Sequence, residues 1–125
     1  SALAPGFQGC LVLGALNMDL KAEADATWPK QGTTTVGNFF ASPGGKGANE
    51  AVALACLGVR VHLVGRVGRD EMGRLLFEHL SQPRFGCLDF ANVMVDSSSS
   101  TGVAVQLATA RDKQKTTVIC QGAND

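Results

Sequence analysis

The stretch of sequence that decides the fold is residues 42–65, which read SPGGKGANEAVALACLGVRVHLVG. A glycine-rich loop leads into a segment from Ala48 to Val59 whose apolar residues follow the spacing i, i+3, i+4, i+7. This spacing predicts a helix with one buried face that ends near Gly58. Val61–Val64 is then a short apolar run before a glycine, which predicts a strand. Loop, helix and strand in this order are typical of a parallel α/β layer.

Segments on both sides extend this layer. Cys10–Leu16 is a short apolar run, which predicts a strand buried on both faces. Glu71–Leu80 has helical spacing and Val93–Val95 is another apolar run, so we expect a second helix and a further strand. The sheet and helix core should therefore occupy about residues 10–19 and 44–96.

Two other regions have the period of partly solvated strands. Leu20–Ala26 alternates small or apolar residues with charged ones, and Thr33–Phe40 is rich in β-branched and aromatic residues. Residues 101–120 contain a second pair of such segments around a charged turn at 111–115, which is typical of a hairpin. These strands do not suit a sheet covered by helices, so they predict a separate small sheet from about 20–40 and 101–120.

Composition excludes several classes of protein. The chain has 125 residues, of which 45% are hydrophobic and 18% charged, so it can bury a core. Its formal net charge is 0, whereas proteins that bind nucleic acid through phosphates usually carry a basic excess. No apolar run approaches the roughly 20 residues of a membrane span. We therefore expect neither nucleic acid nor membrane as a partner.

The cysteines predict free thiols rather than a metal or disulfide framework. There is no CxxC pair and no other metal-ligand spacing in the sequence. Each cysteine lies in an apolar stretch, which predicts buried thiols in a reducing compartment, the cytoplasm. Two disulfides are the alternative. The four residues are Cys10, Cys56, Cys87 and Cys120.

Asn17 and Asp19 form the first candidate site. They follow the first predicted strand, and ligands of open α/β sheets bind beyond the carboxyl ends of strands. Two residues apart in extended chain, an amide and a carboxylate point the same way and can bind neighbouring hydroxyl groups. A turn or helix-cap pair is the plainer alternative.

The second candidate is the loop Gly44-Gly45-Lys46-Gly47-Ala48-Asn49. Free backbone N–H groups and the positive end of a helix dipole meet there, and glycines let a ligand approach the backbone. Gly47 follows Lys46 where a Walker A loop has Ser or Thr. Glu50 takes the third glycine position of a dinucleotide fingerprint, which argues against a Rossmann oxidoreductase. A flexible loop with a surface lysine is the alternative reading.

These residues together resemble a known family. VLGALNMDL at 12–20 is similar to the first strand and Asn-x-Asp of the ribokinases, a branch of the pfkB carbohydrate kinases. FFASPGGKGANEAVALACLGVRVHLVGRVG at 39–68 resembles the first signature of that family. STGVAV at 100–105 and QGAN at 121–124 resemble its later lid segments. The resemblance covers the chain from about residue 10 to 124.

The resemblance implies a fold and a set of site residues. The fold is the ribokinase-like α/β three-layer sandwich, a Rossmann-like parallel sheet with a small protruding β-sheet as a lid, of which residues 1–125 are the N-terminal portion. The Asn-x-Asp pair would hold ribose hydroxyls, the glycine-rich loop would complete the sugar site, and the second lid pair would add an apolar contact. The residues so assigned to substrate binding are Asn17, Asp19, Gly45, Lys46, Asn49 and Ile119.

The resemblance also implies an activity. The full-length enzyme would transfer the γ-phosphoryl group of ATP to the 5-hydroxyl of ribose, with Mg²⁺ and K⁺ as further cofactors and a homodimer formed through the lid. The second family signature, Gly-Ala-Gly-Asp, which carries the catalytic base, does not occur in this sequence. We therefore expect a fragment that has no catalytic residue, is inactive alone and tends to self-associate.

Three departures from the family pattern, which we expect to flank the site, leave fine specificity open. Glu50 stands where ribokinases usually have Gln, Gly32-Thr33-Thr34 replaces Gly-Glu-Thr, and Trp28 before Pro29 is unusual. A sibling kinase for another sugar or a nucleoside is thus one alternative. A truncated, non-catalytic module for sugar binding or dimerisation is the other.

Overall fold

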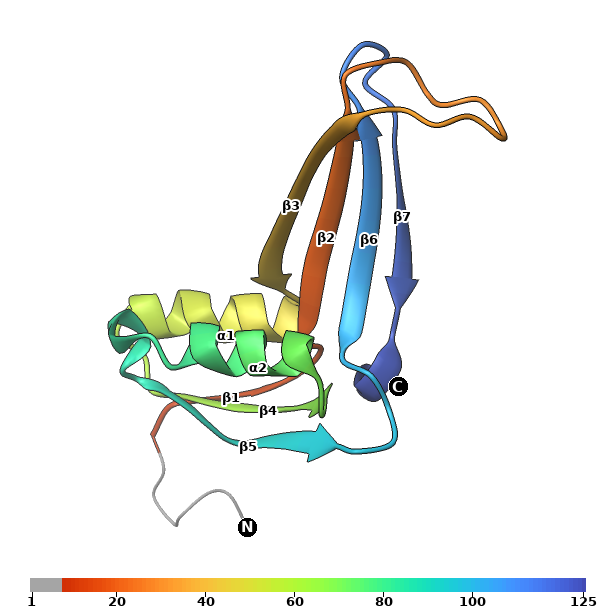
Figure 1. Ribbon diagram of the computed structural model, residues 1–125. Helices are drawn as coiled ribbons and strands as arrows, with labels where there is room; N and C mark the ends of the chain where they lie inside the picture. Colours follow the sequence, from red (N-terminus) through yellow and green to blue (C-terminus); the bar gives the residue numbers. More distant parts are fainter. Residues whose placement is uncertain (1–7) are drawn as a thin grey trace.

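The chain folds into two β-sheets, as the computed structural model of residues 8–125 shows (Figure 1). Residues 1–7, which begin the predicted N-terminal portion of a ribokinase-like domain, lie outside the described residues. One sheet has three parallel strands in the order β1-β4-β5, and the other has four strands in the order β3-β2-β6-β7. The strands are β1 (Cys10–Leu13), β2 (Asn17–Ala24), β3 (Gly37–Gly44), β4 (Val61–Gly68), β5 (Leu88–Asp96), β6 (Gly102–Thr109) and β7 (Lys115–Cys120).

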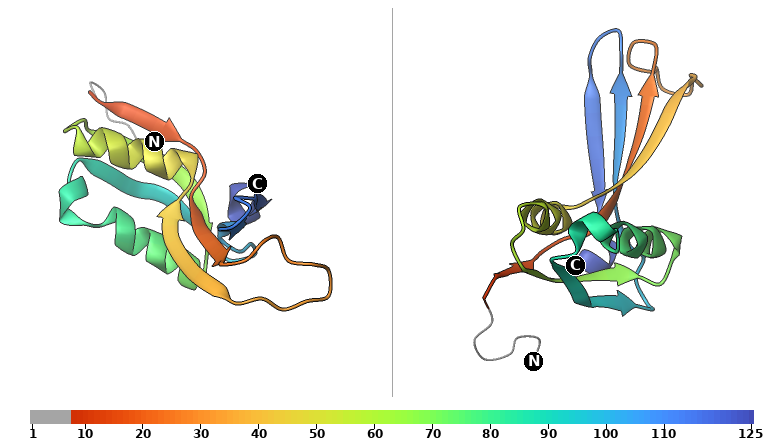
Figure 2. Two further views of the ribbon diagram at one scale, coloured as in Figure 1. Left: turned by 90° about the horizontal axis from the view of Figure 1, so that it is seen from above. Right: turned by 90° about the vertical axis from the view of Figure 1, so that its left-hand side faces the viewer.

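Two helices, α1 (Lys46–Cys56) and α2 (Glu71–Leu80), pack side by side on one face of the three-stranded sheet (Figure 2). Both confirm the helical spacing of the sequence. Short 3₁₀ turns, η1 (Pro83–Phe85) and η2 (Gly122–Asn124), follow α2 and β7. The four-stranded sheet stands away from this layer as a separate blade, as the figure shows from two sides.

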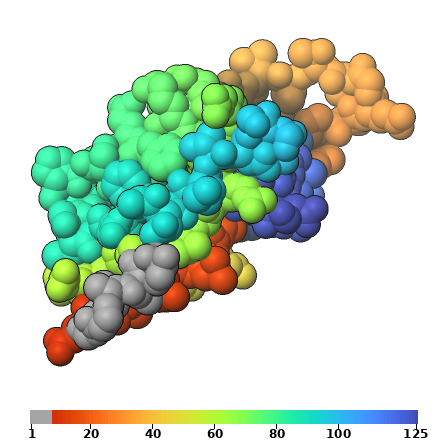
Figure 3. Space-filling model, turned by 90° about the horizontal axis from the view of Figure 1, so that it is seen from below, coloured from red at the N-terminus to blue at the C-terminus, as the bar shows by residue number. Residues whose placement is uncertain are grey.

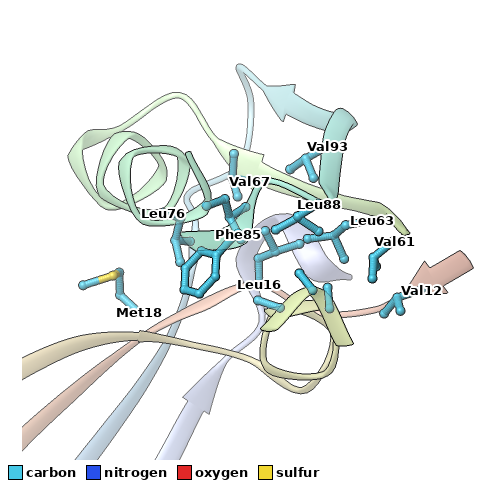
Figure 4. Packing of buried hydrophobic residues seen from close by; sticks show 14 residues of the cluster. Val12, Leu16, Met18, Val61, Leu63, Val67, Leu76, Phe85, Leu88 and Val93 are labelled. Carbon is cyan, nitrogen blue, oxygen red and sulfur yellow. The ribbon is translucent and has the colours of Figure 1, made fainter. Parts of the chain in front are cut away.

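The core lies between the helices and the three-stranded sheet (Figure 4). Leu16, Leu63 and Leu76 have no exposed surface and come from the β1–β2 connection, β4 and α2. Burial of each such side chain stabilises the fold by about 1.5–3 kcal/mol. Met18, from the base of the four-stranded sheet, is also buried in this core and so fixes the blade to the body.

The opposite face of the three-stranded sheet has no helix over it among residues 8–125. Figure 3 shows the molecule from this side. Leu11 and Leu13 on β1 are 53% and 78% exposed, and Met94 on β5 is 60% exposed. The prediction that residues 10–16 are a strand buried on both faces is therefore wrong. The strand ends at Leu13 and is an edge strand, covered by α1 on one side only.

The ends of two blade strands also differ from the sequence-based expectation. β2 begins at Asn17 rather than Leu20, since only three residues separate it from β1. The predicted strand Thr33–Phe40 is shifted along the chain to Gly37–Gly44. Residues 33–36 belong to the exposed loop, and Pro43 is accommodated because β3 is an edge strand.

All four cysteines are free thiols, as expected, but their predicted burial is wrong. Cys56, Cys87 and Cys120 are exposed, and Cys10 is partly buried. Cys56 lies in the last turn of α1, and Cys120 lies on the edge strand β7, whose six residues are all exposed. An apolar neighbourhood in sequence did not place these side chains inside. No helix in the described part of the chain is long and apolar enough to cross a membrane.

Asp70 joins the start of α2 to the base of the blade. Its carboxylate accepts hydrogen bonds from the N–H of Gly73 at 2.9 Å, the N–H of Thr101 at 2.8 Å and the Thr101 hydroxyl at 2.6 Å. Thr101 Oγ1 in turn accepts a bond from the N–H of Gly68 at 2.9 Å. Burial opposes ionisation of Asp70, but the bonds from Thr101 and Gly73 outweigh it and lower the pKa of the carboxyl.

We predict that Asp70→Ala in the full-length protein lowers the free energy of unfolding by about 1–2 kcal/mol, the cost of losing a helix N-cap. Thr101 would also lose its partner. Chemical denaturation followed by circular dichroism measures the change. Glu78→Ala on the same helix is the control, because it removes only an exposed ion pair with Arg74 and should cost much less. Equal losses in the two variants would contradict the role assigned to Asp70.

Candidate functional site

The candidate site lies at the base of the blade, where β2 and β3 meet the N-terminus of α1 (Figure 1). The chain reaches this point through Gly14–Leu16, the connection from β1 to β2. The N–H of Ala48 donates to the carbonyl oxygen of Ala15 at 3.2 Å, which fastens the start of α1 to that connection. The site is therefore held between the two sheets.

Asn17 and Asp19 lie on one face of β2, as their spacing predicts. Both are half-buried. Asn17 pairs with Gly44 on β3 and with Gly102 on β6, so a glycine stands on each side of it. The amide and the carboxylate therefore share a face with little side-chain bulk beside the amide.

Gly44 makes the space that the Asp19 carboxylate occupies. A Cβ atom built on Gly44 would overlap the carboxylate oxygens of Asp19. The carboxylate must therefore lie directly over the backbone of Gly44, next to the residue that begins α1. Because Gly44 does not have a positive φ, this is a requirement for space and not for an unusual backbone.

Gly45 caps α1 in a conformation that favours glycine. Its φ is +94°, and a Cβ there would lie 2.8 Å from the backbone nitrogen of Asn17. Lys46 and Asn49 follow on the first turn, and both are exposed. The structure thus brings Gly45 against Asn17, while no hydrogen bond in the described residues joins Lys46 or Asn49 to Asp19. They stay predicted site residues by their place on α1.

Burial raises the pKa of the Asp19 carboxyl above its ordinary value. The folded chain therefore binds a proton at Asp19 more readily than the unfolded chain does. The ionised form of Asp19 lowers the stability of the fold, and this loss disappears as the pH falls through the raised pKa. No salt bridge joins Asp19 to a cationic side chain within residues 8–125. A half-buried carboxylate of this kind is typical of a residue kept for binding rather than for stability.

Ile119 lies in the same row of the blade as Asp19. The row runs from Ser42 through Asp19 and Ala104 to Ile119, so all four side chains share one face. Two strand spacings, about 10 Å, separate Ile119 from Asp19, which is the width of a small ligand. A hollow of about 390 Å³ on this face is lined by Asp19, Lys21, Phe40, Ser42, Ala104 and Thr117, among others. Ile119 remains a predicted contact.

A second hollow, of about 400 Å³, lies between the carboxyl end of β1 and the middle of β4. Its lining includes Gly14, Ala15, Gly65, Arg66 and Asn124. Gly14 and Ala15 place this hollow against the β1–β2 connection, at the carboxyl end of β1. This is the edge at which open α/β sheets bind ligands.

Sequence reasoning missed Asn124 as a site residue. Its side-chain Nδ2 donates to Asn17 Oδ1 at 2.7 Å and to the Leu16 carbonyl oxygen at 3.0 Å. Its Oδ1 accepts from the N–H of Leu16 at 3.0 Å. The only signal was the QGAN motif, because nothing local in the sequence indicates a contact between residues 108 positions apart.

The sequence departures lie at different distances from the site. Glu50 is on the first turns of α1, close to the candidate residues. Trp28 and residues 32–34 are in the loop at the far end of the blade, where the N–H of Trp28 donates to Asp112 at 2.9 Å. Asn17 starts β2 and Ala24 ends it, so about 23 Å of strand separates that loop from the site. Trp28 therefore does not flank the site, contrary to the sequence-based expectation.

Comparison with known proteins identifies the family. The sequence profile of the pfkB family carbohydrate kinases matches residues 8–125. The chain therefore belongs to the pfkB family of carbohydrate kinases, and its fold is the ribokinase-like fold predicted from the sequence.

Within this family the chain is similar to ribokinases. It is 36% identical over 115 residues to "Ribokinase" of Bacillus subtilis, covering 91% of this chain and 37% of that protein. The solved structure of Arabidopsis thaliana ribokinase complexed with ribose and ATP superimposes with a TM-score of 0.83 at 33% identity, covering 94% of this chain and 37% of the other. A "5-dehydro-2-deoxygluconokinase" of Geobacillus thermodenitrificans is 34% identical over 95 residues, covering 75% of this chain and 26% of that protein. The chain thus spans just over a third of the length of the ribokinases it matches.

We predict that Gly44→Ala in the full-length protein weakens binding of a ligand that contacts Asp19 by about tenfold to a hundredfold, because the new methyl group displaces the Asp19 carboxylate. Stability should change little, since the Asp19 side chain can rotate away. Isothermal titration with ribose and thermal unfolding measure the two effects.

Gly86→Ala is the matched control. Gly86 has helical φ of −60°, and an added Cβ would meet only the Pro83 oxygen at 3.4 Å. Sugar affinity should be unchanged there. Unaltered affinity in Gly44→Ala would contradict the position assigned to the Asp19 carboxylate.

Proposed function

We propose that this chain is the N-terminal, sugar-binding portion of a ribokinase that phosphorylates D-ribose to ribose 5-phosphate using ATP. The observation that carries the proposal is the arrangement of Asn17 and Asp19 on one face of β2, with Gly44 and Gly45 pressed against them. The resemblance of the whole chain to ribokinases supports ribose as the sugar.

The chemistry of the pair suits a sugar. A carboxylate accepts hydrogen bonds only, and an amide can both donate and accept, so together they can bind two neighbouring hydroxyl groups. Hydrogen bonds to a charged group are about twice as strong as neutral ones, which makes Asp19 the stronger of the two contacts. In the proposed complex Lys46, Asn49 and Ile119 complete the site from α1 and β7.

The role of these residues in phosphoryl transfer is positioning. Transfer of a phosphoryl group depends on alignment of the acceptor oxygen and on stabilisation of charge. The blade standing over the site would act as a lid that excludes water from the acceptor hydroxyl. None of the described residues is assigned as the catalytic base.

We propose ATP, Mg²⁺ and K⁺ as the cofactors of the full-length enzyme. Use of ATP is supported by the similar ribokinase that was solved with ribose and ATP. Residues 8–125 contain no group of three or more His, Cys, Asp or Glu side chains that could hold a metal ion. No residue of this chain is therefore assigned to a metal.

We propose that the blade also forms a homodimer and that the enzyme is cytoplasmic. Its edge strands carry exposed apolar side chains on the face opposite Asp19, among them Phe39 at 67% and Val118 at 59%. Such a surface is typical of a protein contact. The free thiols support a reducing compartment.

A kinase of the same family acting on a different sugar is the second candidate. The similarity to a 5-dehydro-2-deoxygluconokinase favours it, because that relative is matched at nearly the same identity as the ribokinases. The two candidates share Asp19 as a hydroxyl-binding residue and differ in the acceptor.

Release of ADP from the full-length protein tests the proposal. We expect release with ribose and not with fructose, adenosine, 5-dehydro-2-deoxygluconate or no acceptor. Asp19→Ala should lower kcat/KM for ribose by about tenfold to a hundredfold, the loss of a hydrogen bond to a charged group. Glu23→Ala, further along the same face of β2, is the control and should leave kcat/KM unchanged. Release of ADP only with another acceptor would identify a different substrate. If a folded protein released no ADP with any acceptor, kinase activity would be refuted.

Sugar binding should also depend on pH through Asp19. As the pH falls through the raised pKa of Asp19, the carboxylate gains a proton and loses its strongest acceptor. The dissociation constant for ribose should therefore rise on acidification, starting above the ordinary aspartate pKa of about 3.9. Titration calorimetry between about pH 4 and pH 7 measures this. Asp19→Asn should bind weakly without this dependence, and a wild-type affinity independent of pH would contradict the role of Asp19.

A further inference from the structure

We propose that Asn124 is a positioning residue that fixes the Asn17 side chain with its NH₂ group facing the sugar, so that Asn17 acts as a hydrogen-bond donor and Asp19 as the acceptor. This inference rests on the proposed function for the identity of the sugar. The orientation of Asn17 itself does not depend on it.

The backbone of Leu16 determines the orientation of the Asn124 amide. The N–H of Leu16 donates to Asn124 Oδ1, and the carbonyl oxygen of Leu16 accepts from Asn124 Nδ2, both at 3.0 Å. Rotating the amide by 180° would place two donors together and two acceptors together. Only one orientation of Asn124 therefore satisfies both groups of Leu16, which has no exposed surface.

The orientation of Asn124 determines that of Asn17. One hydrogen of Asn124 Nδ2 bonds to Leu16 O, and the other bonds to an oxygen, Oδ1, of Asn17 at 2.7 Å. An Asn17 side chain turned the other way would place its NH₂ group against the NH₂ group of Asn124. Asn17 must therefore present oxygen to Asn124 and NH₂ away from it, and Nδ2 of Asn17 has no partner among residues 8–125.

The surrounding backbone is shaped to allow this contact. A Cβ atom on Gly102 would overlap both Asn124 Nδ2 and Asn17 Oδ1, so the bond exists only because position 102 has no side chain. The turn η2 is held by bonds from the N–H of Ala123 to Ser100 O at 2.8 Å and from the N–H of Asn124 to Gln121 O at 3.1 Å. Asn124 is thus placed by both the β5–β6 connection and the end of β7.

The consequence is a site with fixed polarity. The hydroxyl that contacts Asn17 must accept a hydrogen bond, and the hydroxyl that contacts Asp19 must donate one. In Asn124→Asp the new carboxylate can still accept from Leu16 N, but it has no hydrogen to give to Asn17 Oδ1 or to the Leu16 carbonyl oxygen. Asn17 would then turn to donate its own NH₂ to the new carboxylate and present oxygen to the sugar, which reverses the polarity of this contact.

Hydrogen exchange of the side-chain NH₂ groups, observed by NMR in the full-length protein without ligand, tests the orientation directly. In the wild type the Asn124 NH₂ should exchange slowly, because both of its hydrogens are bonded, and the Asn17 NH₂ should exchange rapidly. In Asn124→Asp the Asn17 NH₂ should become protected. A slowly exchanging Asn17 NH₂ in the wild type would overturn the proposal, and this measurement needs no variant to fold.

Ribose titration tests the consequence for binding. Asn124→Asp should raise the dissociation constant and KM for ribose by about tenfold, with kcat changed much less. In an Asn17→Ala background the same substitution should have a much smaller effect, because only the lost bond to the Leu16 carbonyl oxygen remains. Gln121→Glu, which adds the same charge on an exposed neighbour, should leave KM unchanged. Equal losses in both backgrounds would show a purely structural Asn124 and overturn the proposal.

The two tests separate this inference from the proposed function. If the wild type binds no ribose but shows the predicted exchange pattern, the sugar is wrong and the orientation of Asn17 stands. If ribose binds and the exchange pattern is reversed, the sugar stands and the role of Asn124 fails.

Discussion

The structure depends on three residues, Gly14–Leu16, that carry the chain directly from the three-stranded sheet into the blade. So short a connection leaves the start of β2 no freedom to move relative to the end of β1. Every bond to this connection therefore also positions the site. Ala15 is held by α1 through Ala48, and Leu16 is held on both of its backbone groups by Asn124. The buried Leu16 side chain fixes the same point from inside the core.

Local periodicity was enough to predict the helices and the main site pair. Both helices were predicted because each has one apolar stripe along its length, and this stripe packs against one face of the three-stranded sheet. Asn17 and Asp19 were predicted as a pair because alternation in extended chain is a local property. The ribokinase-like fold was predicted because several motifs along the chain, among them the glycine-rich segment at 42–49, resemble those of a known family.

The errors arose where the deciding contact is distant in sequence. The apolar run at 10–16 does not reveal that β1 is an edge strand, since neighbours in a sheet are set by the whole topology. Cys56 and Cys120 lie among apolar residues, yet the helix face and the strand edge that they occupy face solvent. Asn124 could not be assigned to the site from its own neighbourhood, because its partners are at the other end of the chain.

The two carboxylates of the described region with the clearest environments have opposite effects on the fold. Asp70 accepts three hydrogen bonds and has a lowered pKa, so its ionised form stabilises the junction of α2 and the blade above the pKa of an unfolded aspartate. Asp19 is partly desolvated and has a raised pKa, so its ionised form costs stability at neutral pH. Asp70 thus increases the stability of the fold, whereas ionised Asp19 decreases it. This is a common distinction between residues of the scaffold and residues of a binding site.

The bond between Asn124 and the β1–β2 connection also imposes an order of assembly. It closes a loop of 108 residues, and pairing of β2 with β6 closes one of 85 residues. Closing a long loop costs conformational entropy before any contact compensates for it, so such contacts form late in folding. On the ribosome the β2–β3 hairpin emerges early and must wait, with its pairing edge open, until β6 and η2 have been synthesised. The candidate site would thus be the last part of this region to exist, and its formation would report that the whole segment has folded.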